Sequence, residues 1–158
     1  MTKDSNQVAA YTITILGEKS PHQLTIPGRL PGLNEYTSAC RTNHMTGAAM
    51  KQQSQDIVLW SIYSKMRKVH FEKPVFLLFT FYEKDKRRDR DNVASYARKV
   101  IQDALVKAGT LDDDGWDHVT GYLDRFEVDS KNPRIVVEFI EQEVAAKCSK
   151  RQSKKSEK

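Results

Sequence analysis

Four segments of this chain have patterns of hydrophobic and polar residues that predict strands. The segment 11–16, Tyr-Thr-Ile-Thr-Ile-Leu, alternates well enough to form a first strand. The run 75–82, Val-Phe-Leu-Leu-Phe-Thr-Phe-Tyr, is apolar on both faces, which is typical of a central strand. Two further alternating runs, 122–128 and 134–140, flank the turn-like segment 129–133. They predict an antiparallel hairpin.

Two other segments repeat their apolar residues every three or four positions, which predicts helices. The first covers about 48–69 and ends before Pro74. The second follows Asn92, a good N-cap residue, and ends before Gly109, a residue that favours the left-handed conformation found after helix C-termini. Between 26 and 36, two Pro-Gly pairs predict a long loop. This order predicts an α+β fold with two helices packed on one mixed or antiparallel sheet of about four strands.

The length of 158 residues suits one domain with its own core. We expect a single folded domain over 11–145, a disordered N-terminus over 1–10 and a disordered basic tail over 146–158. Lys and Arg outnumber Asp and Glu by 26 to 21, but residues 147–158 contain six of the basic residues and one of the acidic ones. The tail therefore carries the net charge of +5. It either binds polyanions or only aids solubility.

Several classes of protein are disfavoured by the sequence. The longest apolar run is far shorter than the roughly 20 residues that a membrane span needs, and no signal peptide precedes the domain. We therefore expect a soluble, cytoplasmic protein without membrane contact. The two cysteines, Cys40 and Cys148, make no disulfide framework. Neither a glycine-rich phosphate loop nor a nucleophilic serine elbow occurs, which disfavours a nucleotide cofactor and acyl transfer.

The most informative segment for function is 87–92, Arg-Arg-Asp-Arg-Asp-Asn, which one predicted helix separates from the acidic segment 111–116, Leu-Asp-Asp-Asp-Gly-Trp. Carboxylates two residues apart on an extended segment face the same way, so Asp89 and Asp91 can reach one cation. A hard cation such as Mg²⁺ needs only a few carboxylates besides water and phosphate oxygens. Arginines, which bind phosphate, alternate with these acids. The segment therefore indicates metal-dependent hydrolysis of a phosphodiester.

Lys99 lies on the polar face of the second predicted helix, where its ammonium group can stabilise the negative charge of a phosphodiester transition state. Asp103, four residues later, can orient Lys99 or simply pair with it. The simpler alternative is that the acids only cap a helix, which for Asp89 and Asp91 alone is the more common arrangement. The three consecutive acids at 112–114 likewise suit a solvated turn.

Other kinds of site fit less well. A calcium-binding loop fails at its fifth and sixth positions. Cys40 and His44 have the spacing of half a zinc site, but the remaining His and Cys residues supply no second pair. Trp60 and Trp116 are both expected to pack, although Trp116, beside the acidic segment, could also stack on a base or close off the site.

In their order and spacing these segments resemble the RusA family of Holliday junction resolvases, in particular its longer phage-type branch. The resemblance rests on four motifs: Leu-Pro-Gly-Leu-Asn-Glu-Tyr at 30–36, Arg-Arg-Asp-Arg-Asp-Asn at 87–92, Lys99 with Asp-Ala-Leu at 103–105, and Gly109 before the triple Asp at 112–114. The end of the domain, 129–141, is similar to the final hairpin of that branch. The resemblance covers about residues 11–141.

The resemblance implies a homodimeric endodeoxyribonuclease that binds four-way DNA junctions and resolves them by paired symmetric nicks during DNA recombination and repair. It implies Mg²⁺ as the cofactor, with Mn²⁺ as a substitute. It assigns the catalytic, metal-binding aspartates to Asp89, Asp91 and Asp114, and the catalytic lysine to Lys99. We expect DNA contacts from five further residues: Arg87, Arg88, Arg90, Asn34 and Asn92.

Departures from the family pattern leave alternatives open. The span from Asn92 to Lys99 is four residues longer than in the short bacterial form, so an ungapped count puts Ser95 at the lysine position. The triple Asp also leaves Asp112 or Asp113 in place of Asp114. Two other functions remain open as well: a non-catalytic DNA-binding module, and another metal-dependent phosphoesterase acting on nucleotides or RNA.

Helix geometry sets a further condition on the site. A helix of about 17 residues is about 25 Å long. Asp114 therefore cannot lie beside Asp91 within one chain if that helix is straight. Either the helix breaks early, or the two acids meet across a two-fold dimer interface. We treat the second arrangement as a hypothesis.

Overall fold

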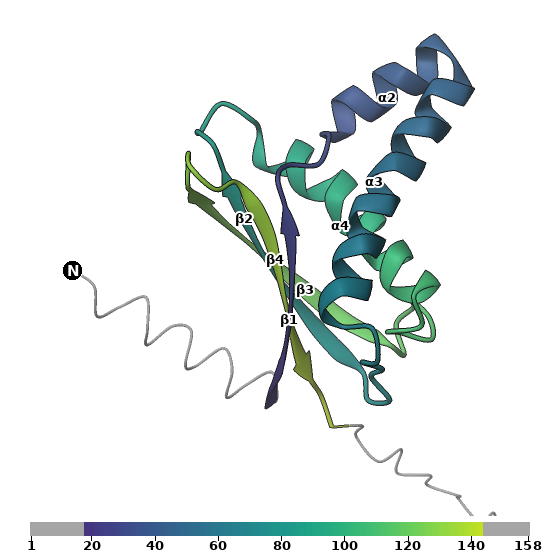
Figure 1. Ribbon diagram of the computed structural model, residues 1–158, viewed down its shortest axis with the longest axis vertical. Helices are drawn as coiled ribbons and strands as arrows, with labels where there is room; N and C mark the ends of the chain where they lie inside the picture. The colour runs from purple at the N-terminus through teal and green to yellow at the C-terminus, as the bar shows by residue number, and fades with distance from the viewer. Residues whose placement is uncertain (1–17, 144–158) are drawn as a thin grey trace, which may run out of the picture.

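A computed structural model shows an α+β fold with a four-stranded mixed sheet and three helices among residues 18–143, the part of the chain that the structure describes (Figure 1). The elements are, in order, β1 Glu18–Pro27, α2 Leu33–Thr42, α3 His44–Lys65, β2 Val75–Glu83, α4 Arg90–Lys107, β3 Val119–Val128 and β4 Arg134–Glu141. The fold class is as the sequence predicts. The predicted strand at 11–16, the N-terminus at 1–10 and the tail at 146–158 lie outside the described residues.

The sheet has the strand order β1-β4-β2-β3. β4 runs antiparallel to both β1 and β2, whereas β3 runs parallel to β2 at one edge. The predicted hairpin is therefore wrong, because β2 lies between the two strands that were to pair. The segment 129–133, which connects β3 to β4, crosses the end of β2. There the Asp129 amide donates to the Glu83 carbonyl at 2.8 Å. A central position suits β2, since both of its faces are rich in apolar side chains.

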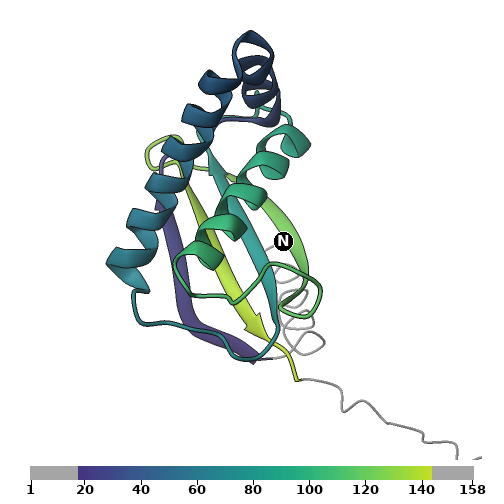
Figure 2. The ribbon, with the colours of Figure 1, turned by 90° about the vertical axis from the view of Figure 1, so that its right-hand side faces the viewer.

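The core lies between the sheet and the two helices α3 and α4, which cover one face (Figure 2). Leu77, Phe79 and Phe81 of β2 point into it and are fully buried. Helix α4 adds eight buried residues to the same core: Val93, Ala94, Tyr96, Ala97, Val100, Ile101, Ala104 and Leu105. Burying a Leu or Phe side chain contributes about 1.5–3 kcal/mol. The sheet therefore holds α4, which carries most of the candidate site, along its whole length.

The first predicted helix is present, shifted by about one turn, as α3. The segment 26–36, predicted as a loop, contains a real turn at Gly28, whose φ is +77°, but also the end of β1 and the start of an extra helix, α2. The helix α2 has no buried residue. Leu33, Tyr36 and Cys40 recur at helical spacing, but only Tyr36 packs against the core and the helix has just 10 residues. None of the helices among residues 18–143 is long and apolar enough to cross a membrane.

The N-termini of α2 and α4 are joined by one side chain. The N-cap of α4 is Asp89 and not Asn92, since an Asp89 carboxylate oxygen accepts from the Asn92 amide at 3.1 Å. Asn92 lies in the first turn, and its Oδ1 accepts from the backbone N–H of Asn34 at 2.7 Å. The N-cap of α2 is Gly32, which has no side chain to accept this bond. Asn92 supplies the cap in its place.

Replacing Asn92 with Ala is expected to lower the free energy of unfolding by about 1 kcal/mol, because an amide at the start of α2 loses its acceptor. Urea denaturation followed by circular dichroism measures the change. Asn34→Ala is the matched control, since Asn34 contributes only its backbone N–H to the bond and its side chain is exposed. Equal losses in the two variants would contradict a capping role for Asn92.

Candidate functional site

Lys99 and Asp114, which the RusA-like motifs assign to one site, are in direct contact. The Lys99 Nζ lies 2.9 Å from Oδ2 of Asp114. The contact forms because the chain turns back along α4 after that helix ends (Figure 2). Lys99 also pairs with Asp103, one helical turn later, at 2.8 Å. Of the three consecutive aspartates, Asp114 is the one that reaches the lysine.

The residues directly after α4 fix the turn that leads the chain back along this helix. Gly109 has a φ of +77°, as predicted for the residue after a helix C-terminus. Thr110 and Leu111 are buried, and both of their amides donate to the Leu105 carbonyl, at 3.0 and 3.2 Å. The Nδ1 of His70 lies 2.7 Å from the carbonyl oxygen of Gly109. These contacts direct the following acidic residues back toward the middle of α4.

The contact between lysine and aspartate keeps both groups charged. The hydrogen bond from Lys99 lowers the pKa of Asp114 below its ordinary value of 3.8. Hydrogen bonds to Asp103 and then to Asp114 raise the pKa of Lys99 above its ordinary value. The ammonium group has three N–H donors, and the two carboxylates take two of them. Because the Lys99 side chain is 62% exposed, a phosphate oxygen can reach the third donor.

Asp89 and Asp91 do not lie on one extended segment, and that part of the prediction is wrong. Asp89 has extended backbone angles as the N-cap of α4, whereas Asp91 belongs to the first helical turn. The helix starts earlier than predicted because the carboxylate of Asp89 caps it. Capping uses one oxygen of Asp89 and leaves the second free. Both aspartates are exposed.

Asp124 of β3 is a further carboxylate beside α4. It binds Arg98 of α4 through Oδ2, while its Oδ1 is buried without a hydrogen-bond partner. Burial raises the pKa of Asp124, Arg98 opposes this shift, and the nearby charge of Asp91 adds to it. The sequence did contain a signal, because Asp124 shares one face of its alternating segment with Tyr122 and Phe126. An acidic residue on a mostly aromatic strand face indicates that its side chain has a partner on a neighbouring element, here α4.

The predicted metal ligands do not form one set within a single chain. Asp91 and Lys99 are eight residues apart on α4, a distance of about 12 Å. Asp114, which contacts Lys99, is therefore about two helical turns from Asp91. The helix is unbroken from Arg90 to Lys107, so an early break does not bring the acids together. Among residues 18–143, no three His, Cys, Asp or Glu side chains are grouped closely enough to hold a metal ion.

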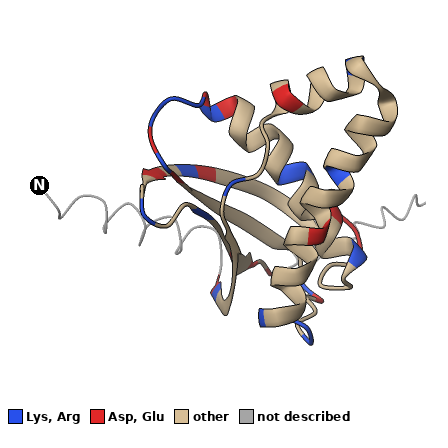
Figure 3. Ribbon diagram, turned by 45° about the horizontal axis from the view of Figure 1, so that its top comes forward, with Lys and Arg blue, Asp and Glu red and all other residues tan. Residues whose placement is uncertain are grey.

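The arginines of the segment 87–92 have different surroundings. Figure 3 shows basic residues along the loop between β2 and α4, next to acidic residues at the start of α4. The Arg87 side chain is 90% exposed. The Arg90 guanidinium is exposed and lies 5.6 Å from the centre of the Phe126 ring. Arg87 and Arg90 are thus accessible to a phosphate backbone.

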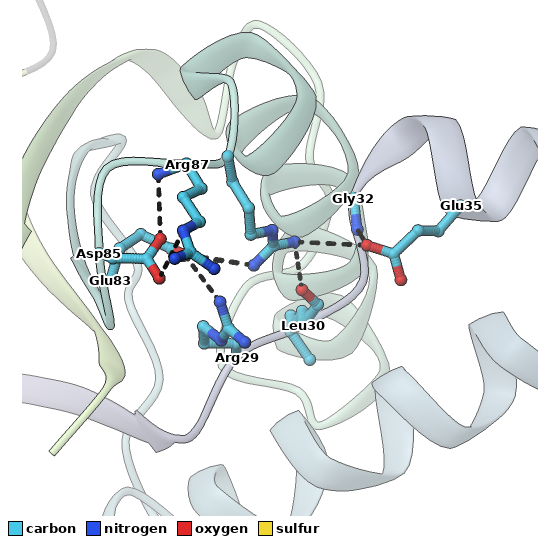
Figure 4. Close-up of polar contacts among 8 residues, drawn as sticks. Arg29, Leu30, Gly32, Glu35, Glu83, Asp85 and Arg87 are labelled. Carbon is cyan, nitrogen blue, oxygen red and sulfur yellow. Dashed lines mark hydrogen bonds and ion pairs between the residues drawn. The ribbon is translucent and has the colours of Figure 1, made fainter. Parts of the chain in front are cut away.

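Arg88, by contrast, is only 17% exposed and is bound within the protein. It donates to the Leu30 carbonyl at 2.8 Å and pairs with Glu83 at 3.3 Å. Its other neighbour is the Glu35 carboxylate, at 3.9 Å. Figure 4 shows Leu30, Glu35 and Glu83, the three partners of this arginine. Arg29 approaches Glu83 at 3.6 Å. This cluster ties the end of β2 to the loop before α2, which assigns Arg88 a structural role.

Both tryptophans were predicted to pack, and both predictions are wrong. Trp60 is 66% exposed and Trp116 is 96% exposed. Trp60 lies between Leu59 and Ser61, which face the core, and it points outward from α3. Trp116 follows Asp114 by two residues. An almost fully exposed Trp beside the candidate site leaves the stacking of a base as the open alternative.

Neither a scan of the chain against protein-family models nor a search of curated proteins gives a match. The resemblance to the RusA family therefore rests on the motifs in the sequence alone.

Proposed function

We propose that this protein is an endodeoxyribonuclease that cleaves four-way DNA junctions. The observation that carries the proposal is the contact of Lys99 with Asp114. The motifs assign these two residues to one catalytic site although 15 positions separate them. A chance resemblance gives no reason for them to meet. Their ion pair on the exposed side of α4 is what such a site needs.

In this proposal Lys99 stabilises the charge that develops on the scissile phosphate, and Asp114 and Asp103 orient its ammonium group. Mg²⁺ would supply a Lewis acid and a bound water of lowered pKa. Asp91 is the exposed carboxylate best suited to attract the cation to this end of α4. Within one chain the three predicted ligands lie too far apart to hold one Mg²⁺ ion together.

This separation supports a homodimer whose two copies share their sites. Two symmetric nicks need two sites related by a two-fold axis. If the partner brings its own Asp114 to Asp91, each site is completed by both copies. The unbroken α4 favours this arrangement over a site within one chain.

DNA binding is proposed for the loop before α4. Arg87 and Arg90 are exposed there, and the N-termini of α2 and α4 lie next to each other through the Asn92 contact. Helix N-termini attract phosphate through their free amides and their dipoles. Because the chain outside the tail has no net charge, this local positive field has to supply the affinity of the domain.

A nicking assay on a four-way junction, a linear duplex and a single strand, each with and without Mg²⁺, tests the proposal. We expect paired symmetric nicks in the junction only, and only with Mg²⁺. Cleavage of single strands or RNA without preference for the junction would instead identify another phosphoesterase. Junction binding without any nick would overturn the proposed activity.

One observation favours a second candidate, a non-catalytic DNA-binding module. Asp89 caps α4, so at least one of the predicted catalytic acids has a structural role that needs no metal. Such a module would bind DNA equally with and without Mg²⁺, and its affinity would fall steeply with salt.

Trp116 is expected to stack on an unpaired base when the protein binds a junction, because its ring is exposed beside Asp114. In a Trp60→Phe background, which leaves Trp116 as the single tryptophan, its fluorescence should be quenched on adding junction DNA in EDTA. Trp116→Ala should weaken junction binding by about tenfold. Unchanged fluorescence at saturating DNA would rule out stacking.

A further inference from the structure

A small cavity of about 220 Å³ lies beside Lys99. Residues of three helices line it: Leu33, Tyr36, Lys51, Ser95, Tyr96, Lys99 and Val100. The surface of this cavity is mostly apolar, although the lysine at its edge belongs to the proposed catalytic site. Its volume is below the roughly 300–1,000 Å³ of sites for drug-sized ligands, which suits one planar ring system.

The walls of the cavity are aromatic and held in place. The Tyr36 and Tyr96 rings are 5.1 Å apart and inclined by 40°. Tyr96 is 4% exposed, and its hydroxyl donates to the Ser54 hydroxyl at 3.0 Å. Leu33, at the start of α2, is 41% exposed and forms an apolar lip. A flat apolar group can therefore enter without rearranging the core.

The edge of the cavity is cationic. Lys51 and Lys99 both bind the Asp103 carboxylate, at 3.2 and 2.8 Å, and Lys99 also binds Asp114. Of the six N–H donors on the two ammonium groups, these three contacts leave three unused. The cavity thus combines an apolar, aromatic interior with free cationic donors at its edge. A nucleotide has the complementary pattern, with a flat base joined to a phosphate.

We propose that this cavity binds one unstacked nucleobase of the DNA strand whose phosphate lies at Lys99. The inference rests on the proposed function, since it uses the same lysine. A base pair does not match a pocket for a single ring system, so the base has to leave the stack, as it does in enzymes that act on extruded nucleotides. The pocket would then favour substrates with weakened stacking at the crossover.

Ser95→Phe tests the inference, because a Phe at this wall position fills the cavity. Ser64→Phe is the matched control, since Ser64 is exposed on α3 and outside the cavity. Junction affinity is measured in EDTA by fluorescence anisotropy, so that the result does not depend on cleavage. We expect binding about tenfold weaker for Ser95→Phe and unchanged for Ser64→Phe. Equal affinity of both variants would overturn the inference.

Photo-cross-linking from 5-iododeoxyuridine at the crossover gives a second readout on the wild-type protein. The cross-link is expected at Tyr36 or Leu33, and cross-links only outside the cavity would overturn the inference.

If circular dichroism shows that Ser95→Phe does not fold, Leu33→Ala replaces it. Junction affinity is then expected to fall several-fold, because the exposed apolar side chain at the edge of the cavity is removed. A changed oligomeric state of Ser95→Phe would assign the cavity to a contact between copies and also overturn the inference. Wild-type protein that binds and cross-links but never nicks would overturn the nuclease proposal alone.

Discussion

Asp91→Asn is expected to reduce junction cleavage by about 10³-fold or more, while the affinity for the junction stays within about twofold. Asp91 is exposed at the start of α4, so removing its charge leaves the fold intact. Affinity persists because phosphate neutralisation by Arg and Lys provides most of it. Single-turnover cleavage in Mg²⁺ and anisotropy in EDTA measure the two effects separately. Full cleavage by this variant would exclude Asp91 from the reaction.

The same variant tests whether sites are shared between copies. In a shared arrangement, a heterodimer of Asp91→Asn and Asp114→Asn subunits has one site that lost both acids and one intact site. Random mixing should produce about half heterodimers, and these should nick one strand without resolving the junction. Each variant alone should be inactive. A mixture that stays inactive would show that each chain has to build its own site.

Arg88→Ala is expected to lower the free energy of unfolding by about 3 kcal/mol, because it leaves the buried Glu83 carboxylate without its main partner. Arg29 remains at 3.6 Å from Glu83 but is more exposed than Arg88, so it compensates only in part. Urea denaturation at neutral pH measures the loss.

Arg87→Ala is the matched control for this prediction. Its side chain is 90% exposed, so the free energy of unfolding should change by less than about 0.5 kcal/mol. Junction binding should weaken, and the slope of log affinity against log salt should fall by about one. A stable Arg88→Ala protein with weakened DNA binding would instead place Arg88 among the DNA contacts.

The sequence predicted the elements of the fold better than their pairing. The period of α4 and the apolar run of β2 are strong local signals, and both elements are present. The insertion of β2 between β3 and β4 could not be predicted, because alternation tells which face of a strand is buried but not which strand is its neighbour. α2 was missed because it is short and buries no residue, and only its Tyr36 packs against the core, on the Tyr96 ring.

The candidate site could be predicted only in part, because local motifs do not show which residues meet in space. Lys99 and Asp114 belong to recognisable motifs. Their contact forms because the chain turns back toward α4 at Gly109. Asp89 was misplaced because a carboxylate before a helix can cap it or bind a cation, and the sequence does not distinguish the two. The burial of Arg88 depends on Glu83 and Leu30, and nothing in the sequence indicates that the Leu30 carbonyl lies beside it.

The central claim is that Lys99 and Asp114 belong to the catalytic site of a junction-cleaving nuclease. Single-turnover cleavage of a four-way junction in Mg²⁺ by wild type, Asp114→Asn and Asp112→Asn tests it most directly. Asp112 is the control, because it is exposed in the same acidic segment and lies near His70 instead of Lys99. We predict paired nicks at similar rates from wild type and Asp112→Asn, and a loss of about 10³-fold for Asp114→Asn. Cleavage by Asp114→Asn at the wild-type rate would contradict the claim.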